Sequence, residues 1–102
     1  MDETRIVKLI DRKDPNRKSW HIRAILQHGP GVLKTVAEMN KGTIHLRHLA
    51  ARLLVIRGIE EFSVLRYHIV IQKGRAFDWE ELEPEVDEAL KEFVTKTLAD
   101  SK

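Results

Sequence analysis

The sequence predicts an α+β protein, in which an antiparallel sheet of four, or at most five, strands carries two α-helices on one face. Three observations indicate this class. Short apolar runs alternate with a period of two, two longer segments place apolar residues at helical spacing, and the strands come in pairs joined by short links. Two helices are too few to cover both faces of a sheet, so they are placed together on one face. The 102 residues are the usual size of one domain, which we expect to span residues 1–102.

Two strands are predicted in the first quarter of the chain. Residues 5–10 are a short run rich in β-branched side chains, which favours a strand. In residues 20–26, every second side chain is apolar from Trp20 to Leu26, as in a half-buried strand with Trp20 facing inward. The turn signal Asp14-Pro15-Asn16 lies between them, so the two runs are expected to pair as an antiparallel hairpin.

The middle of the chain contains one ambiguous segment and one well-defined helix. Residues 28–31 are expected to form a loop, and residues 32–39 fit either a short helix or a third strand, a choice that stays open. Thr43 is placed as the N-cap and Gly58 as the C-cap of the helix that follows. Its apolar stripe consists of residues at helical spacing: Leu46, Leu49, Ala50, Leu53 and Ile56.

The last part of the chain predicts two more strands and a helix. Residues 62–65 and 67–73 are the strands, and Asp78 with Glu81 matches a capping box that begins the helix. Pro84 follows six residues after that cap, where an unbroken helix would lose a hydrogen bond and suffer a clash, at a cost of about 3 kcal/mol. We therefore expect a tight turn first, and a main helix that restarts with Pro84 in its first position.

Composition excludes several kinds of protein. The chain has no cysteine, so it holds no disulfide, no thiolate nucleophile and no metal or iron–sulfur site on its own sulfur atoms. No run approaches the roughly 20 apolar residues of a membrane span, and the N-terminus has acids where a signal peptide has bases, so we expect a soluble cytoplasmic protein. Residues 1–75 carry a net charge of +8 and residues 76–102 one of −6. Such a division can indicate an anionic partner for the basic part, but neutralisation by an acidic C-terminal helix within one fold is the favoured explanation.

No residue pattern indicates catalysis or a metal site. His45 and His48 lie three apart on the predicted helix and would need His21 or His68 as further ligands, whereas a solvated basic helix face explains the same residues. The carboxylates between Asp78 and Glu88 are accounted for by capping and by the helix dipole. We therefore expect no catalytic residue, no metal ligand and no enzyme activity.

The segment from Leu54 to Val94 contains three distinctive blocks, of which the most specific is Asp-Trp-Glu-Glu-Leu-Glu-Pro-Glu-Val at residues 78–86; the others are Ile-Arg-Gly-Ile at 56–59 and a strand block at 68–73. In these blocks and in the spacings between them, the segment resembles the N-terminal domain of the Nfu/NifU scaffold proteins of iron–sulfur cluster assembly. The turn at Asp14 is similar to the family's Thr-Pro-Asn-Pro motif, but Arg17 replaces its second proline. Leu65 and Arg66 stand where many members have Gly-Pro.

The resemblance implies a non-catalytic accessory domain that binds cluster-assembly or recipient proteins. It implies that this chain contacts iron–sulfur clusters only through its partner proteins. Iron binding is implied for the family, not for this chain. Family members often continue into a domain whose Cys-x-x-Cys pair holds the cluster, and this chain has no cysteine. The partner-binding residues we expect are basic: Arg17, Lys18, Arg47, His48, Arg52 and Arg66. The alternative is a small nucleic-acid-binding domain that uses its basic face, which the inward-facing aromatic residues do not favour.

Overall fold

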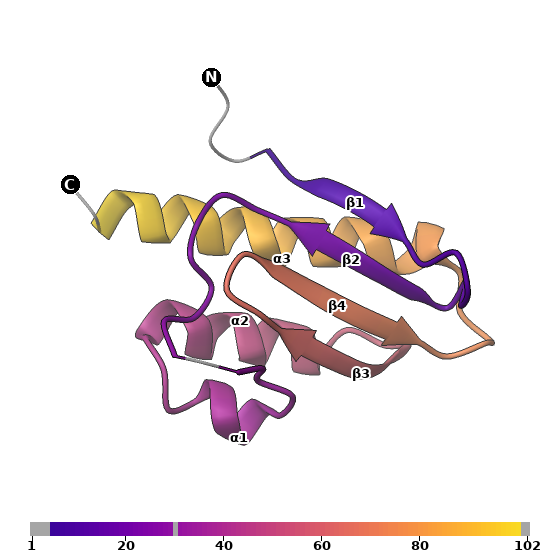
Figure 1. Ribbon diagram of the computed structural model, residues 1–102, viewed down its shortest axis with the longest axis horizontal. Helices are drawn as coiled ribbons and strands as arrows, with labels where there is room; N and C mark the ends of the chain where they lie inside the picture. Colours follow the sequence, from indigo (N-terminus) through magenta and orange to yellow (C-terminus); the bar gives the residue numbers. More distant parts are fainter. Residues whose placement is uncertain (1–4, 30, 101–102) are drawn as a thin grey trace.

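The protein is built from one four-stranded antiparallel sheet and three helices (Figure 1). The computed structural model describes residues 5–29 and 31–100, so Pro30 of the predicted loop and the ends of the predicted domain lie outside it. The elements are β1 (Val7–Ile10), β2 (Arg17–His21), α1 (Val36–Met39), α2 (Ile44–Leu54), β3 (Ile59–Val64), β4 (His68–Lys73) and α3 (Trp79–Asp100). The strand order is β1-β2-β4-β3, which confirms the predicted α+β class.

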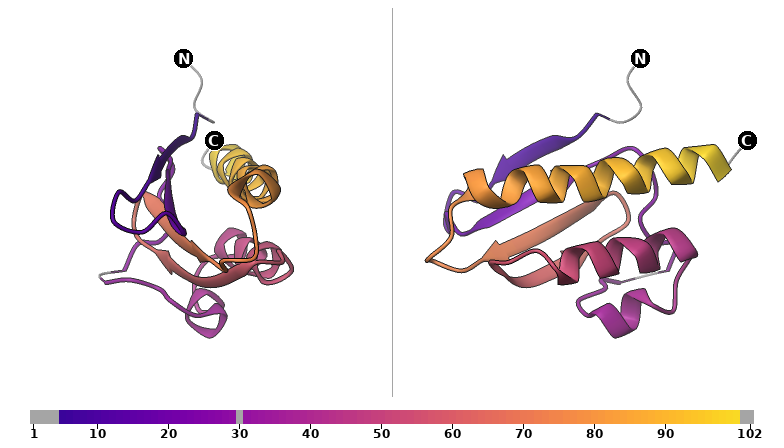
Figure 2. Two further views of the ribbon diagram at one scale, coloured as in Figure 1. Left: turned by 90° about the vertical axis from the view of Figure 1, so that its right-hand side faces the viewer. Right: turned by 180° about the vertical axis from the view of Figure 1, so that it is seen from behind.

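The two long helices lie on the same side of the sheet and leave its other side uncovered (Figure 2). The core fills the space between these two layers. Trp20, Ile69 and Ile71 enter it from the sheet and are fully buried, as are Val86 and Leu90 from α3. Burying one side chain of this size contributes about 1.5–3 kcal/mol to folding. The inward orientation predicted for Trp20 is confirmed.

The second strand begins and ends earlier than its alternating pattern predicted. β2 spans Arg17–His21 instead of residues 20–26, because its neighbour β4 offers partners only from His68 onward. Beyond His21 the chain follows the turn that precedes β4, with bonds from the amides of Ile22 and Leu26 to the carbonyls of Tyr67 and Arg66. Ile22, Ala24 and Leu26 in this segment are still buried. The alternating pattern therefore extends beyond the end of the strand, which explains the longer prediction.

The ambiguous segment is a short helix next to a single bridge. Thr35 caps α1: its hydroxyl accepts a bond from the amide of Glu38, and the Glu38 carboxylate accepts one from the amide of Thr35. Before it, Leu33 forms one antiparallel bridge to Val64 at the edge of β3. The possible fifth strand is therefore only this single bridge. Within the described part of the chain, the sheet has four strands.

The helix α2 begins as predicted but ends earlier. Thr43 is its N-cap and accepts a bond from the amide of Leu46, and the apolar stripe lies in the core. Its C-cap is Val55, so the assignment of Gly58 as the cap is wrong. Gly58 instead takes a φ of +100° in the turn before β3, where a side chain would collide with the ring of Phe77. Only glycine fits both requirements.

The last helix runs through Pro84 without a break, which corrects the prediction that it restarts there. Pro84 lacks the amide that would bond to the carbonyl of Glu80, but both residues are exposed, so water can satisfy this carbonyl. Leu82 and Val86, on either side of the proline, are buried in the core. Their burial favours one continuous helix over two segments.

Candidate functional site

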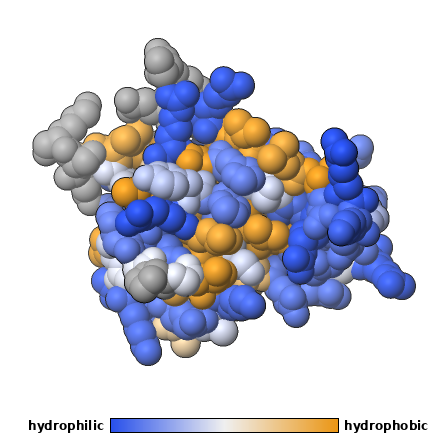
Figure 3. Space-filling view, viewed as in Figure 1, coloured by the Kyte–Doolittle hydropathy of each residue, from blue (hydrophilic) through white to orange (hydrophobic). Residues whose placement is uncertain are grey.

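The uncovered side of the sheet presents a mixed apolar and polar surface to solvent. Side chains alternate along a strand, so the residues out of phase with Trp20 and Ile69 point away from the helices. We call this surface the open face; its central residues are Val7, Leu9, Arg17, Ser19, His21, His68, Val70 and Gln72. Figure 3 shows this side of the molecule, where hydrophobic residues gather in the middle among hydrophilic ones.

A shallow hollow of about 280 Å³ lies on the open face across β1, β2 and β4. Leu9, Ser19 and Val70 contribute to its lining, together with two histidines. Leu9 of this lining is 55% exposed, and Val7, two residues earlier on the same face of β1, is 43% exposed. Exposed apolar side chains that stand together among polar ones are typical of interaction surfaces. The hollow is therefore the strongest candidate for a binding site on this side of the protein.

Two histidines stack on each other inside the hollow. His21 and His68 are directly paired across β2 and β4, with ring centroids 4.6 Å apart and ring planes 20° from parallel. The hydroxyl of Ser19 lies 3.0 Å from Nε2 of His21 and 3.3 Å from the carbonyl oxygen of Leu9, to which it donates. Burial, followed by the neighbouring charge of His21, lowers the pKa of His68 below its ordinary value of 6.5. At a given pH, His68 is therefore less protonated than a solvent-exposed histidine.

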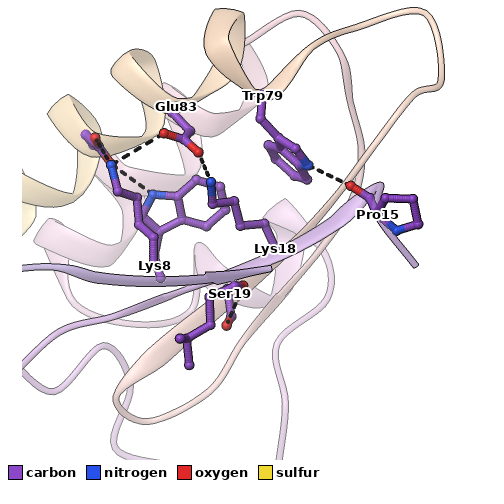
Figure 4. A network of polar contacts seen from close by, with 9 residues as sticks. Lys8, Pro15, Lys18, Ser19, Trp79 and Glu83 are labelled. Atoms are coloured by element: carbon purple, nitrogen blue, oxygen red, sulfur yellow. Dashed lines mark hydrogen bonds and ion pairs between the residues drawn. The ribbon is translucent and has the colours of Figure 1, made fainter. Parts of the chain in front are cut away.

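The adjacent basic residues Arg17 and Lys18 lie on opposite faces of the sheet. Arg17 belongs to the open face, where its Nε donates to Oε1 of Gln72 at 3.1 Å. Lys18 points towards α3, where it pairs with Glu83 and lies 5.7 Å from the ring centre of Trp79 (Figure 4). Alternation along β2 thus separates two residues that the sequence prediction grouped together.

The other predicted partner-binding residues are spread over the molecule. Arg47, His48 and Arg52 lie on α2, on the helix-covered side, and Arg66 lies in the turn between β3 and β4. Nη1 of Arg52 is 2.6 Å from Oε2 of Glu92 on α3, so this guanidinium bridges the two helices. His48 and Arg52 share a narrow cleft between α2 and α3, and the six residues do not form one surface.

A polar network that the sequence analysis missed fixes the first two strands onto α3 (Figure 4). Nζ of Lys8 is 2.9 Å from Oδ2 of Asp87 and 3.5 Å from Oε2 of Glu83. Oδ1 of Asp87 also accepts a 2.8 Å hydrogen bond from the indole of the fully buried Trp20. Burial, followed by the charge of Lys8, lowers the pKa of Lys18, which joins the network through Glu83. Glu83 and Asp87 stand four apart on one helix face, and this spacing was the available signal.

The indole of Trp79 forms a second link between α3 and the hairpin of β1 and β2. Its Nε1 donates to the carbonyl of Pro15 at 2.8 Å, and its ring meets that of Trp20 edge-on, with centroids 5.7 Å apart (Figure 4). Trp79 is half-buried against the core and is engaged by this turn. The ring of Trp79 therefore packs between α3 and the hairpin and is not an exposed anchor for a partner.

The histidines considered as metal ligands do not converge. His45 and His48 lie on α2, on one side of the sheet, and His21 and His68 lie on the open face on its other side. Among the residues that the structure describes, no group of three or more histidines, cysteines and carboxylates is arranged to hold a metal ion. Within the same residues, no helix is both long and apolar enough to cross a membrane.

The fold has relatives among solved structures. The solution structure of a NifU-like protein from Saccharomyces cerevisiae matches with a TM-score of 0.66 and 18% identity, over 86% of this chain and 76% of that one. The crystal structure of protein SAV1430 from Staphylococcus aureus matches with a TM-score of 0.60 and 12% identity, over 82% of this chain and 95% of that one. At these identities the likeness concerns the fold alone. No curated protein matches this sequence.

A family model gives the assignment. The model described as the N-terminal part of the scaffold protein Nfu/NifU matches residues 13–97. This range includes the ambiguous segment at residues 32–39. The match extends from the turn before β2 to the last turns of α3, and so takes in β2, β4 and α3, whereas β1, with Val7, Lys8 and Leu9, lies before it. This chain therefore belongs to the Nfu/NifU N-terminal family of scaffold proteins of iron–sulfur cluster assembly.

Proposed function

We propose that this chain is a non-catalytic docking domain, which binds a cluster-carrying protein during iron–sulfur cluster assembly or delivery. The observation that carries the proposal is the family match over residues 13–97. The chain contains no cysteine, so thiolate ligands for a cluster must come from elsewhere. In this proposal the partner holds the cluster on a Cys-x-x-Cys pair, and this domain supplies binding surface. In this proposal the domain acts in the cytoplasm.

We assign the docking to the open face. It combines the exposed side chains of Val7 and Leu9 with a hollow that a partner side chain can fill. Buried apolar anchors surrounded by polar contacts provide most of the energy of protein interfaces. On the helix-covered side, Lys18 and Arg52 are already paired with acids of α3. The open face thus offers exposed apolar side chains to a partner, whereas these two basic side chains are engaged within the chain.

Charge at the end of β2 favours an acidic partner. Arg17 lies at the edge of the hollow, and Arg12 and Lys13 are exposed in the neighbouring turn between β1 and β2. Exposed charges of one sign raise the rate at which an oppositely charged protein associates, and salt weakens this effect. Arg17 is therefore the member of the predicted partner-binding set that we retain for steering a partner onto the open face.

The nucleic-acid alternative receives less support. A surface for single-stranded nucleic acid places aromatic rings beside basic residues. Here Trp20 is fully buried and Trp79 is half-buried beneath the sheet, while the predicted basic residues lie on different faces. Binding to a short oligonucleotide that is undetectable at low salt would remove this alternative.

The proposal is tested by measuring binding to a purified Cys-x-x-Cys domain protein that carries its iron–sulfur cluster. Leu9→Glu places a charge in the hollow and is expected to weaken binding at least about tenfold, since a buried unpaired charge is costly. The matched control is Leu54→Glu, at a leucine that is 69% exposed near the end of α2, and this variant is expected to bind like the unchanged chain. Equal affinity for both variants, or no binding by the unchanged chain, would refute the assignment.

A separate measurement tests the absence of a bound cluster. After anaerobic reconstitution with iron and sulfide, the purified chain is expected to retain no stoichiometric iron and to show no cluster absorbance, because it has no thiolate ligand. One iron atom or one cluster per chain would overturn this part of the proposal, independently of the binding result.

A further inference from the structure

The outer edge of the sheet is unusually apolar for an exposed strand. Within β1, Leu9 is 55% exposed, Ile10 is 53% exposed and Val7 is 43% exposed. β1 is the first strand in the sheet order, so one of its sides has no strand partner among residues 5–29 and 31–100. Proteins usually protect such edges with charged side chains, because unpaired amides and carbonyls invite another strand. The one charge within β1, on Lys8, is directed to Asp87 and Glu83 of α3.

The hydrogen bonds of β1 show which of its residues face outward. The amide of Asp11 donates to the carbonyl of Arg17, and the carbonyl of Leu9 lies close to the Ser19 hydroxyl. The odd-numbered residues therefore direct their backbone groups toward β2. The amides and carbonyls of the even-numbered residues, Lys8 and Ile10 among them, point away from the sheet. These are the groups that a further strand would meet.

We propose that β1 pairs antiparallel with β1 of a second copy of this chain, with Lys8 at the two-fold axis. In this register the numbers of two directly opposed residues add up to 16. Even-numbered residues, whose backbone groups point outward, therefore lie opposite even-numbered residues of the other copy. Ile10 then lies opposite Ile6 of the other copy, and Val7 lies opposite Leu9. The pairing gives each of the three exposed apolar side chains of β1 an apolar neighbour.

The ends of the strand support this register through their charges. With Lys8 at the axis, Arg5 lies opposite Asp11 of the second copy, and the symmetry of the pair repeats this contact at the other end. Directly opposed residues of opposite charge stabilise an antiparallel pair, whereas like charges destabilise it. The two Lys8 side chains meet at the axis, but each is already neutralised by Asp87 and Glu83 of its own copy.

The neighbouring registers fit less well. Moving the axis to Leu9 would place Arg5 opposite Lys13 and Val7 opposite Asp11, which opposes like charges and sets an apolar side chain against a carboxylate. Moving it to Val7 would place Leu9 opposite Arg5 and Lys8 opposite Ile6. The sequence of β1 and its flanks therefore complements itself best about Lys8, which favours a second copy over an unrelated strand.

The inference concerns self-association and stands apart from the proposed function. Its test is sedimentation equilibrium of the purified full chain at low ionic strength. The subunit mass is 11.9 kDa, and we expect a reversible dimer of twice that mass at concentrations up to about 1 mM, since short interfaces bind weakly. Arg5→Glu and Asp11→Arg, each alone, are expected to weaken the dimer at least about tenfold by opposing like charges.

The double variant Arg5→Glu, Asp11→Arg restores opposite charges at both ends and is expected to recover the dimer. In the unchanged chain, the amides of Lys8 and Ile10 are also expected to exchange more slowly with solvent as the protein concentration rises. A chain that stays monomeric, a dimer that neither single variant weakens, or a double variant as weak as the single ones would each overturn the proposal.

Discussion

Replacing Asp87 with alanine is expected to destabilise the protein strongly, because one carboxylate serves two elements of the sheet. Oδ1 of Asp87 accepts the hydrogen bond of the buried Trp20 indole at 2.8 Å, and Oδ2 lies 2.9 Å from Nζ of Lys8. Asp87→Ala leaves the indole donor without its acceptor in the core and removes the partner of the lysine. Asp87→Asn keeps an acceptor for the indole and removes only the charge.

The magnitude follows from the burial of these groups. A buried donor that loses its partner costs about 1–3 kcal/mol, and a hydrogen bond to a charged group lies in the upper part of this range. The Lys8 pair is partly exposed, with 32% and 23% of the two side chains accessible, and contributes about 0.5–1 kcal/mol. We therefore expect Asp87→Ala to cost about 2.5–4 kcal/mol and Asp87→Asn about 0.5–1 kcal/mol.

The assay is thermal and urea unfolding followed by circular dichroism. For a domain of this size, 1 kcal/mol shifts Tm by about 4–8 °C, so Asp87→Ala should lower Tm by about 10–32 °C. The matched control is Glu88→Ala on the next residue of α3, whose side chain is 79% exposed and should leave Tm nearly unchanged. If the alanine and asparagine variants of Asp87 lost equal stability, the indole hydrogen bond would not be the main contribution, and the reasoning would be refuted.

Three further predictions concern the backbone and the hollow. Gly58→Ala should cost about 2–4 kcal/mol, because φ is +100° and the new Cβ would lie 2.7 Å from Cγ of Phe77. Pro84→Ala should raise stability by about 1–2 kcal/mol, because the added amide completes the hydrogen bonds of α3. The pKa of His68 in the folded protein lies below 6.5, so stability should be complete above about pH 7 and should fall as the pH drops through 6.5 toward the folded pKa. His68→Gln should flatten this pH dependence.

Each of these predictions has its own check in urea unfolding. Gly31→Ala is the control for Gly58, since Gly31 has a φ of +87° but no atom within 4 Å of its added Cβ, and should lose only about 1 kcal/mol. Equal losses at the two glycines would show that the contact with Phe77 has no effect. A Pro84→Ala variant that unfolds at lower urea would contradict the account of α3. A pH profile that His68→Gln leaves unchanged would assign the acid sensitivity to other groups.

The elements that sequence patterns predicted well are those in which local chemistry and burial agree. Thr43 begins α2 because its hydroxyl caps the helix. The apolar stripe after it is buried in the core, which fixes the orientation of the helix. Trp20 lies inward because it is in phase with Ile22, Ala24 and Leu26, with the polar His21 and Arg23 between them. By contrast, Thr35 caps a helix of only one turn, and its neighbour Leu33 is held by a single bridge to Val64. Such short elements depend on contacts that local patterns do not contain.

The errors have physical causes of the same kind. The break at Pro84 was predicted from a local penalty, which the burial of Leu82 and Val86 on both sides offsets. Arg17 and Lys18 were grouped by their position in the chain, although alternation along a strand sends neighbours to opposite faces. The pairing of Lys18 with Glu83 depends on how α3 lies across the sheet, which no local pattern determines. The candidate hollow likewise required the register of three strands.

The most direct test of docking through the open face is to map the bound surface residue by residue. Amide chemical shifts of the labelled chain are recorded while a Cys-x-x-Cys domain protein, loaded with gallium or zinc in place of its paramagnetic cluster, is added. We expect the largest changes at Leu9, Ser19 and Val70, in the three strands that line the hollow. Changes confined to α2, around His48 and Arg52, would contradict docking through the open face.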